Sequence, residues 1–138
     1  MRKSILLKKE EENMAKKKVL VIGIDPKLID PNLSTATGWD ANRVRAAAQD
    51  TNKRLMDLGY EVQGCLVDLG ETAESIVSDT LSREKFDCIM VGAGVRMLPQ
   101  HTVVFEKIIN TIHQKAPSSK ICFNTNPADT VEAVLRWM

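Results

Sequence analysis

Two residues of this chain are candidates for acid–base chemistry. Asp25 directly follows a strongly apolar segment, and His101 lies a few residues beyond a second one. Carboxylates and imidazoles transfer protons efficiently when their surroundings bring the pKa close to the working pH. A small enzyme that uses Asp25 or His101 as a general acid or base is therefore one interpretation. Ordinary turn or helix-start roles for both residues are the other.

A long connection after the first apolar segment is a candidate anion-binding site. It runs from Ile24 to Trp39, whereas connections from a strand to a helix usually have about 2–6 residues. The candidate ligand-binding residues in it are Ser34, Thr35, Thr37 and Gly38. Hydroxyl groups and a flexible backbone beside a helix N-terminus favour an anion. The alternative is that these residues only form turns and caps in a surface loop.

A second group of candidates comes from the ends of the other predicted strands. Gly92 and Gly94 allow a ligand to approach the backbone closely, and Arg96 offers bidentate geometry for a carboxylate or a phosphate. Asp68 and Asn126 end two further predicted strands. Taken singly, the glycines indicate a tight strand exit and Arg96 a solvated charge. Their shared position at one edge of a sheet is what indicates a binding site.

The elements that position these residues alternate strictly between strand and helix. Apolar runs predict strands at 18–23, 86–91 and 120–124. A segment that starts with polar alternation at Glu61 and Gln63 and ends in Cys-Leu-Val predicts an edge strand at 60–69. Apolar residues at helical spacing predict helices at 40–58, 72–84, 101–115 and 128–138. Asp40 is placed to cap the first of these helices, and Gly59 is placed to end it.

This order of elements predicts an α/β fold of three layers, Rossmann-like or flavodoxin-like. Repeated strand–helix units form right-handed crossovers onto one parallel sheet, with helices on both faces. The first strand is apolar without alternation and the third is continuously apolar apart from Asp87, so both should be internal, which gives the strand order 2-1-3-4. Sheets of this class bind ligands beyond the carboxyl ends of the strands where the order reverses, here between strands one and three.

The bulk properties narrow the partners and the compartment. The chain has 138 residues and a net charge of +1, which gives no electrostatic reason to expect nucleic acid or an acidic membrane surface as a partner. The sequence contains no apolar run long enough to span a membrane and no metal-ligand spacing. Its three cysteines lie inside apolar segments without a CxxC spacing, which indicates buried, reduced thiols in a cytoplasmic protein.

Residues 1–16 differ in composition from the rest of the chain, which we predict to be a single domain over 17–138. The N-terminal segment is charged and lacks a sustained amphipathic period, so we expect it to be disordered or a non-native extension. Met14 follows a stretch of lysine and glutamate of the kind that a translated ribosome-binding site produces. It is therefore a candidate native start, which N-terminal sequencing of the native protein would test.

Three segments within residues 91–129 resemble part of a known family. They are Val91-Gly-Ala-Gly-Val-Arg96, Val104-Phe-Glu-Lys-Ile-Ile109 and Asn126-Pro-Ala-Asp129. Here the chain resembles the second half of the nucleotide-binding domain of lactate and malate dehydrogenases, over about a third of its length. The resemblance implies a Rossmann-like fold. It also implies that Asn126 lies where the family's asparagine helps to position cofactor and substrate.

The first predicted strand departs from that family. The glycine-rich G-x-G-x-x-G loop is replaced by Gly23-Ile-Asp-Pro-Lys-Leu28, and the chain lacks the substrate domain with the family's catalytic histidine. We therefore expect neither a working dehydrogenase nor ordinary binding of an NAD-type dinucleotide, and the cofactor is unknown. The leading interpretation is a domain that binds a small anionic or nucleotide-like ligand. The alternatives are the acid–base enzyme and a protein-interaction module, such as a homodimer, without catalysis.

Overall fold

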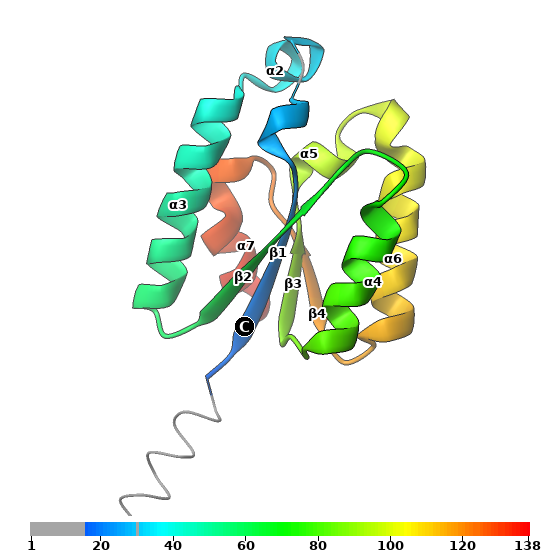
Figure 1. The fold of residues 1–138 in the computed structure, drawn as a ribbon. Helices are drawn as coiled ribbons and strands as arrows, with labels where there is room; N and C mark the ends of the chain where they lie inside the picture. The colour runs from blue at the N-terminus through cyan, green and yellow to red at the C-terminus, as the bar shows by residue number, and fades with distance from the viewer. Residues whose placement is uncertain (1–15, 30) are drawn as a thin grey trace, which may run out of the picture.

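A four-stranded parallel sheet forms the middle layer of the structure, a computed structural model that describes residues 16–29 and 31–138. The strands are β1 (Lys18–Ile24), β2 (Glu61–Val67), β3 (Cys88–Val91) and β4 (Lys120–Phe123). Neighbouring strands are parallel and lie in the order β2-β1-β3-β4 (Figure 1). The predicted fold class and strand order are therefore confirmed.

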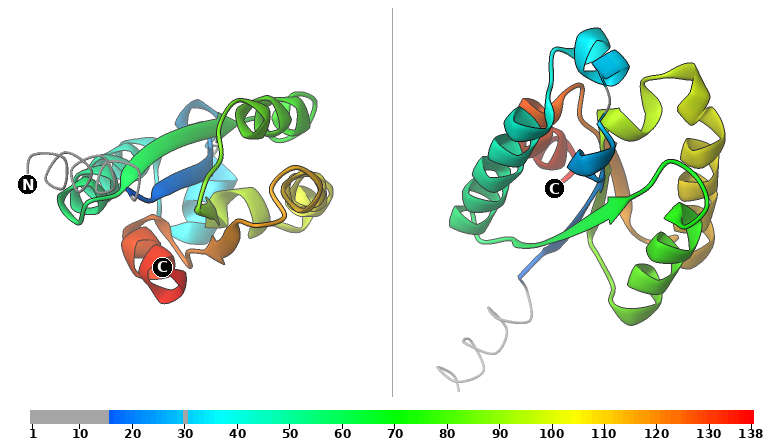
Figure 2. Two further views of the ribbon diagram at one scale, coloured as in Figure 1. Left: turned by 90° about the horizontal axis from the view of Figure 1, so that it is seen from below. Right: turned by 45° about the horizontal axis from the view of Figure 1, so that its top comes forward.

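Helices cover both faces of the sheet. α3 (Ala41–Asp57) and α7 (Thr130–Trp137) lie on one face, and α4 (Ala73–Arg83) and α6 (Thr102–Lys115) lie on the other (Figure 2, left). Short helical segments form parts of the connections: η1 (Pro26–Leu28), α2 (Pro31–Thr37), α5 (Ala93–Arg96), η2 (Pro99–His101) and η3 (Pro127–Asp129). The result is the three-layer arrangement that alternating strands and helices favour.

The internal strands are apolar toward both faces because helices exclude water from both. Leu20 and Ile22 of β1 pack into the core beneath α4 and α6, and Val19 packs into the second core beneath α3 and α7. The unbroken apolar run that predicted an internal strand is thus used on both sides. β2 is an edge strand, and its polar residues Glu61 and Gln63 are exposed, as the alternation in its sequence predicted.

Both predicted end signals of α3 are confirmed. Asp40 Oδ1 accepts a hydrogen bond from the backbone N–H of Arg43 at 2.8 Å, which satisfies one free donor of the first turn. Gly59 follows the C-cap residue Leu58 and has a φ of 94°, a left-handed conformation that favours glycine. Leu58 extends the apolar spacing of the helix but is 55% exposed, because it lies at the very end.

The connection 24–39, which the sequence predicts as a loop, contains two short helical segments. Pro26 begins η1 and Pro31 begins α2. Proline has no backbone N–H, and the first turn of a helix needs none from it, so a residue that predicts a loop also favours a helix start.

The expectations for residues 1–16 and for membrane spans can be compared with the described residues only. The prediction for residues 1–16 concerns a segment that, apart from Lys16, lies outside them. Within them, no helix combines the length and the apolarity that crossing a membrane would require.

The three cysteines are buried thiols. The Sγ atoms of Cys88 and Cys122 lie 3.6 Å apart on neighbouring strands. Cys122 lies opposite Met90 in register, so the two cysteines are offset by two residues, which places their Cα atoms about 8 Å apart, beyond the reach of a disulfide. The hydrogen bond shared with Cys88, together with burial, raises the pKa of the Cys122 thiol. Burial likewise raises the pKa of Cys65.

We expect all three thiols to resist an aromatic disulfide reagent in the folded protein, because a thiolate must form and reach the reagent before it reacts. In guanidinium chloride, all three should react within the mixing time. The absorbance of the released aromatic thiol measures both rates. A cysteine that reacts at its unfolded rate in the folded protein would contradict the buried arrangement.

Candidate functional site

A cavity of about 340 Å³ lies at the carboxyl edge of the sheet, on the face covered by α3 and α7. Its floor is formed by β1, β2 and β3, and one wall by α3. The other wall is the turn from β4 into α7, and residues of η1, α2 and the α2–α3 connection lie above. In the right-hand view of Figure 2 this edge of the sheet is tilted toward the reader, and α2 lies at the top. The sequence predicted a ligand site at the same edge.

Two glycines of the sheet create the floor of the cavity. In register, Gly23 of β1 lies opposite Leu66 of β2, and Gly64 of β2 lies opposite Val21 of β1. A Cβ atom at either glycine would meet no other atom within 4 Å. The floor is open because these two positions lack side chains, a signal present in the sequence that our prediction did not use.

The wall formed by α3 packs against the sheet over only part of its length. Leu55 is fully buried and Thr51 is 4% exposed, whereas Val44 is half-buried and Ala48 is exposed. Val44, Ala48, Thr51 and Asn52 all line the cavity. The second half of the helix is therefore anchored in the core, and the first half spans the open floor.

Asn124 holds the opposite wall together. It directly follows β4, is 4% exposed and lines the cavity. Its Oδ1 accepts a hydrogen bond from the backbone N–H of Ala93 at 2.7 Å, and its Nδ2 donates to Thr130 Oγ1 at 2.9 Å. One side chain thereby joins the ends of β3 and β4 to the start of α7. Our sequence prediction missed Asn124, although a polar residue at the end of an apolar strand is a usable signal.

The turn after Asn124 is held by its own hydrogen bonds. Asn126 Oδ1 accepts from the N–H of Ala128 at 2.8 Å. Asp129 Oδ1 accepts from the N–H of Thr125 at 2.9 Å and from that of Asn126 at 3.2 Å. Burial raises the pKa of Asp129, but the hydrogen bonds from Thr125 and Asn126 more than offset this, and the pKa lies below its ordinary value. The carboxylate thus stabilises the turn that forms this wall.

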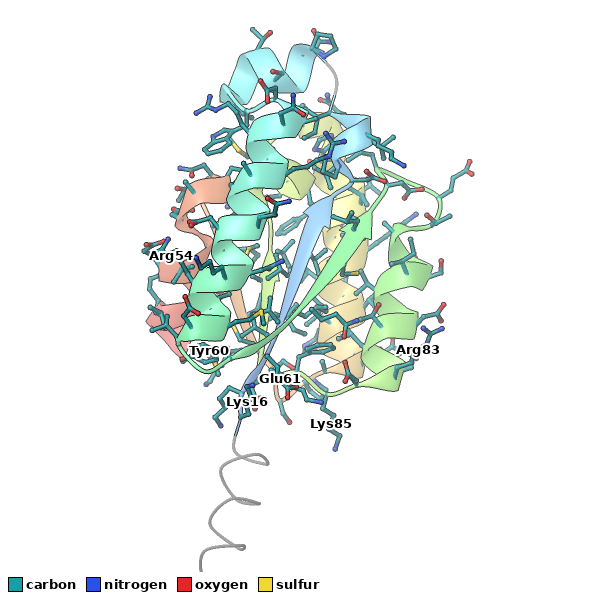
Figure 3. The ribbon with its side chains drawn as sticks, turned by 60° about the vertical axis from the view of Figure 1, so that its left-hand side comes forward. Lys16, Arg54, Tyr60, Glu61, Arg83 and Lys85 are labelled. Carbon is teal, nitrogen blue, oxygen red and sulfur yellow. The ribbon has the colours of Figure 1, made fainter. Side chains whose placement is uncertain are left out.

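Among the described residues, no charged side chain lines the cavity. Its polar side-chain groups are the hydroxyls of threonines, the amides of asparagines and the indole N–H of Trp39. The described residues contain no cluster of three or more metal-binding side chains. Ion pairs lie at the opposite edge of the sheet, where Figure 3 labels Lys16, Glu61 and Lys85. There, Lys18 Nζ lies 3.2 Å from Glu84 Oε1 and 3.9 Å from Glu61 Oε2.

The sequence-predicted site residues divide into two groups. Those that line the cavity are Thr37, Gly92, Gly94 and Asn126. Those that do not line it are Asp25, Ser34, Thr35, Gly38, Asp68, Arg96 and His101. The two glycines of the first group also allow close packing: a Cβ atom would lie 3.1 Å from Ile22 O at Gly92, and 2.9 Å from Ile24 Cγ2 at Gly94.

Arg96, the predicted anion-binding cation, is engaged within the protein. Its Nη2 donates to the backbone carbonyl of Asn124, and its guanidinium lies over the Phe123 ring, 5.3 Å from the centroid. Its Nε is buried without a hydrogen-bond partner among the described residues. The cation therefore stabilises the end of β4.

The remaining ionisable candidates have local roles. Asp25 caps η1 by accepting a hydrogen bond from the N–H of Lys27 at 3.0 Å. Asp68 accepts from Thr72 Oγ1 at 2.8 Å, and this bond is the largest cause that lowers the pKa of Asp68. His101 immediately precedes α6 and is 3% exposed, and its Nδ1 has no hydrogen-bond partner within the described part of the chain. Neither acid–base candidate contributes to the cavity.

Comparisons with known proteins give no identification. No protein-family model matches the chain, and neither does a curated protein or a solved structure. The function is therefore argued from the geometry of the cavity.

Matched substitutions at two glycines test the described floor. We expect Gly92→Ala to lower the free energy of unfolding by about 1–3 kcal/mol, because its Cβ would crowd the Ile22 carbonyl oxygen. Gly64→Ala should leave it unchanged or raise it by up to about 1 kcal/mol, because alanine has free space there and a smaller entropy loss on folding. Urea unfolding measures both values. Equal losses would show that the floor at Gly64 is closed.

The role of Asn124 is tested by removing its amide. We expect Asn124→Ala to lower the free energy of unfolding by about 1–3 kcal/mol, because the Ala93 N–H loses its buried acceptor. Asn110→Ala, at an exposed position of α6, is the control and should change it by less than about 0.5 kcal/mol. If Asn124→Ala lowered the free energy of unfolding no more than the control does, the Asn124 side chain would not link these elements as described.

Proposed function

We propose that this chain binds a small, uncharged organic molecule in the cavity at the carboxyl edge of the sheet. The observation that carries the proposal is a cavity of about 340 Å³ whose described lining contains no charged side chain. Ligand sites typically occupy about 300–1,000 Å³ and combine mainly apolar walls with a few oriented polar groups. Such a lining favours a ligand that pays little electrostatic cost on leaving water.

This ligand differs from the anionic or nucleotide-like one that the sequence predicts. An anion needs a cation or several free donors, and Arg96 is bonded to the Asn124 carbonyl and stacked on Phe123. Because neither Asp25 nor His101 lines the cavity, the proposal is one of binding without a catalytic step.

Trp39 makes binding measurable. It lines the cavity, whereas the other tryptophan, Trp137, is 57% exposed at the end of α7. Trp137→Phe therefore leaves a single indole in the protein, and that indole lies at the site.

In the Trp137→Phe background, we expect uncharged compounds of one or two rings to produce a saturable change in Trp39 emission. Adding Gly64→Leu should weaken this binding at least tenfold, because the leucine side chain would occupy the open floor. Gln63→Leu is the matched control, because it adds the same side chain to the same strand at a position outside the lining, and it should leave binding unchanged.

Two results would count against the proposal. One is that none of the uncharged compounds tested produces a saturable change in Trp39 emission. The other is a folded Gly64→Leu variant that binds the same compounds with unaltered Kd, which would place their site elsewhere.

A further inference from the structure

The two walls of the cavity differ in whether their polar side chains already form hydrogen bonds within the protein. On the wall after β4, the amide oxygens of Asn124 and Asn126 already accept hydrogen bonds from backbone N–H groups. On α3, the side chains of Thr51 and Asn52 form no hydrogen bond with any described residue, although both residues line the cavity. Thr51 is 4% exposed as a residue, its hydroxyl is not among the buried atoms that lack a partner in the described part of the chain, and Asn52 is exposed. Side chains of α3 that line the cavity therefore offer hydrogen-bonding groups to a ligand.

These free groups define what a ligand must offer. The carboxamide of Asn52 places a donor and an acceptor side by side, and its complement is another edge with an adjacent donor and acceptor. The same bidentate pattern lets asparagine read the edge of adenine in nucleic acids. The Thr51 hydroxyl lies next to it in sequence and can either donate or accept. A matching ligand carries an amide-type edge directed at α3.

The floor of the cavity restricts the shape of the ligand. At Gly23 and Gly64 the sheet presents backbone without side chains, and peptide groups are planar. A flat ring can lie along such a surface with most of its atoms in contact, whereas a puckered ring touches it at fewer atoms. Trp39 adds an aromatic surface above, and aromatic rings attract one another in offset or edge-to-face arrangements.

The geometry points to a planar aromatic amide or lactam as the ligand, with its ring on the floor at Gly23 and Gly64 and its donor–acceptor edge on Asn52. This inference rests on the proposed function, because it concerns the same cavity. A cationic ring is disfavoured, since the nearby cation of Arg43 already lies over Trp39, 4.6 Å from the ring centroid.

Three probes of similar size separate the elements of this inference. Benzamide has both the flat ring and the amide edge. Acetophenone keeps the ring but replaces the amide nitrogen with a methyl group, and cyclohexanecarboxamide keeps the amide but has a puckered ring. We expect benzamide to bind the full chain at least tenfold more tightly than either of the others, as measured by titration in proton–nitrogen correlation spectra.

Substitutions on α3 then test where the amide group of the ligand binds. Asn52→Ala should weaken benzamide binding at least fivefold and leave acetophenone binding within twofold, because only benzamide uses the amide. Thr51→Val keeps the shape of the side chain and should weaken benzamide binding about threefold. Asn42→Ala, at an exposed position of the same helix outside the lining, is the matched control and should change neither affinity.

The outcomes distinguish this inference from the proposed function. Equal affinity for the three probes, or unchanged benzamide binding by folded Asn52→Ala, would overturn the aromatic amide class. Cavity binding would still stand in that case if Gly64→Leu blocked the probes. If no probe shifted the resonances of cavity residues, the inference would fall. The proposed function would fall as well if the wider set of uncharged compounds also left Trp39 unaffected, or if folded Gly64→Leu bound them with unaltered Kd.

Discussion

Burial of the sheet on both faces is the constraint on which the rest of this structure depends. Helices on both sides exclude water from the internal strands, so each position there must be apolar or small. β1 and β3 meet this requirement, and their placement in the middle brings the strand ends together at one edge. Gly23 and Gly64 satisfy the backbone pairing of the sheet without supplying side chains, so the packing is incomplete at one place. The cavity is the direct result.

Most of the fold could be predicted from the sequence because its determinants are local. Unbroken apolar runs identified the internal strands, and the polar residues Glu61 and Gln63 identified β2 as an edge. Asp40 and Gly59 marked the ends of α3 by chemistry that operates within one turn of helix. The prediction was wrong for the connection 24–39, where proline is compatible with both a loop and the first turn of a helix.

The candidate site could be predicted in position but not in chemistry. Topology alone sets the edge, and Asn126 and Gly92 do line the cavity there. Whether a polar side chain is free, however, depends on neighbours far away in the sequence. Asn124 bonds to a backbone N–H 31 residues distant, and its own carbonyl accepts from Arg96. No spacing rule reveals such pairings, which is why the predicted cation proved to be engaged and the free amide of Asn52 was overlooked.

The uneven packing of α3 bears on how the cavity opens to solvent. Its second half is held by Leu55 in the core and by Arg54, labelled in Figure 3, which forms an ion pair at 3.0 Å with Glu132 of α7. The first half, with Val44 and Ala48, has fewer buried contacts to oppose fraying. Local opening is easiest where such contacts are fewest. Fraying of the first turns would therefore widen the entrance to the cavity at a smaller cost in free energy than unfolding of the whole domain, while the sheet stays folded.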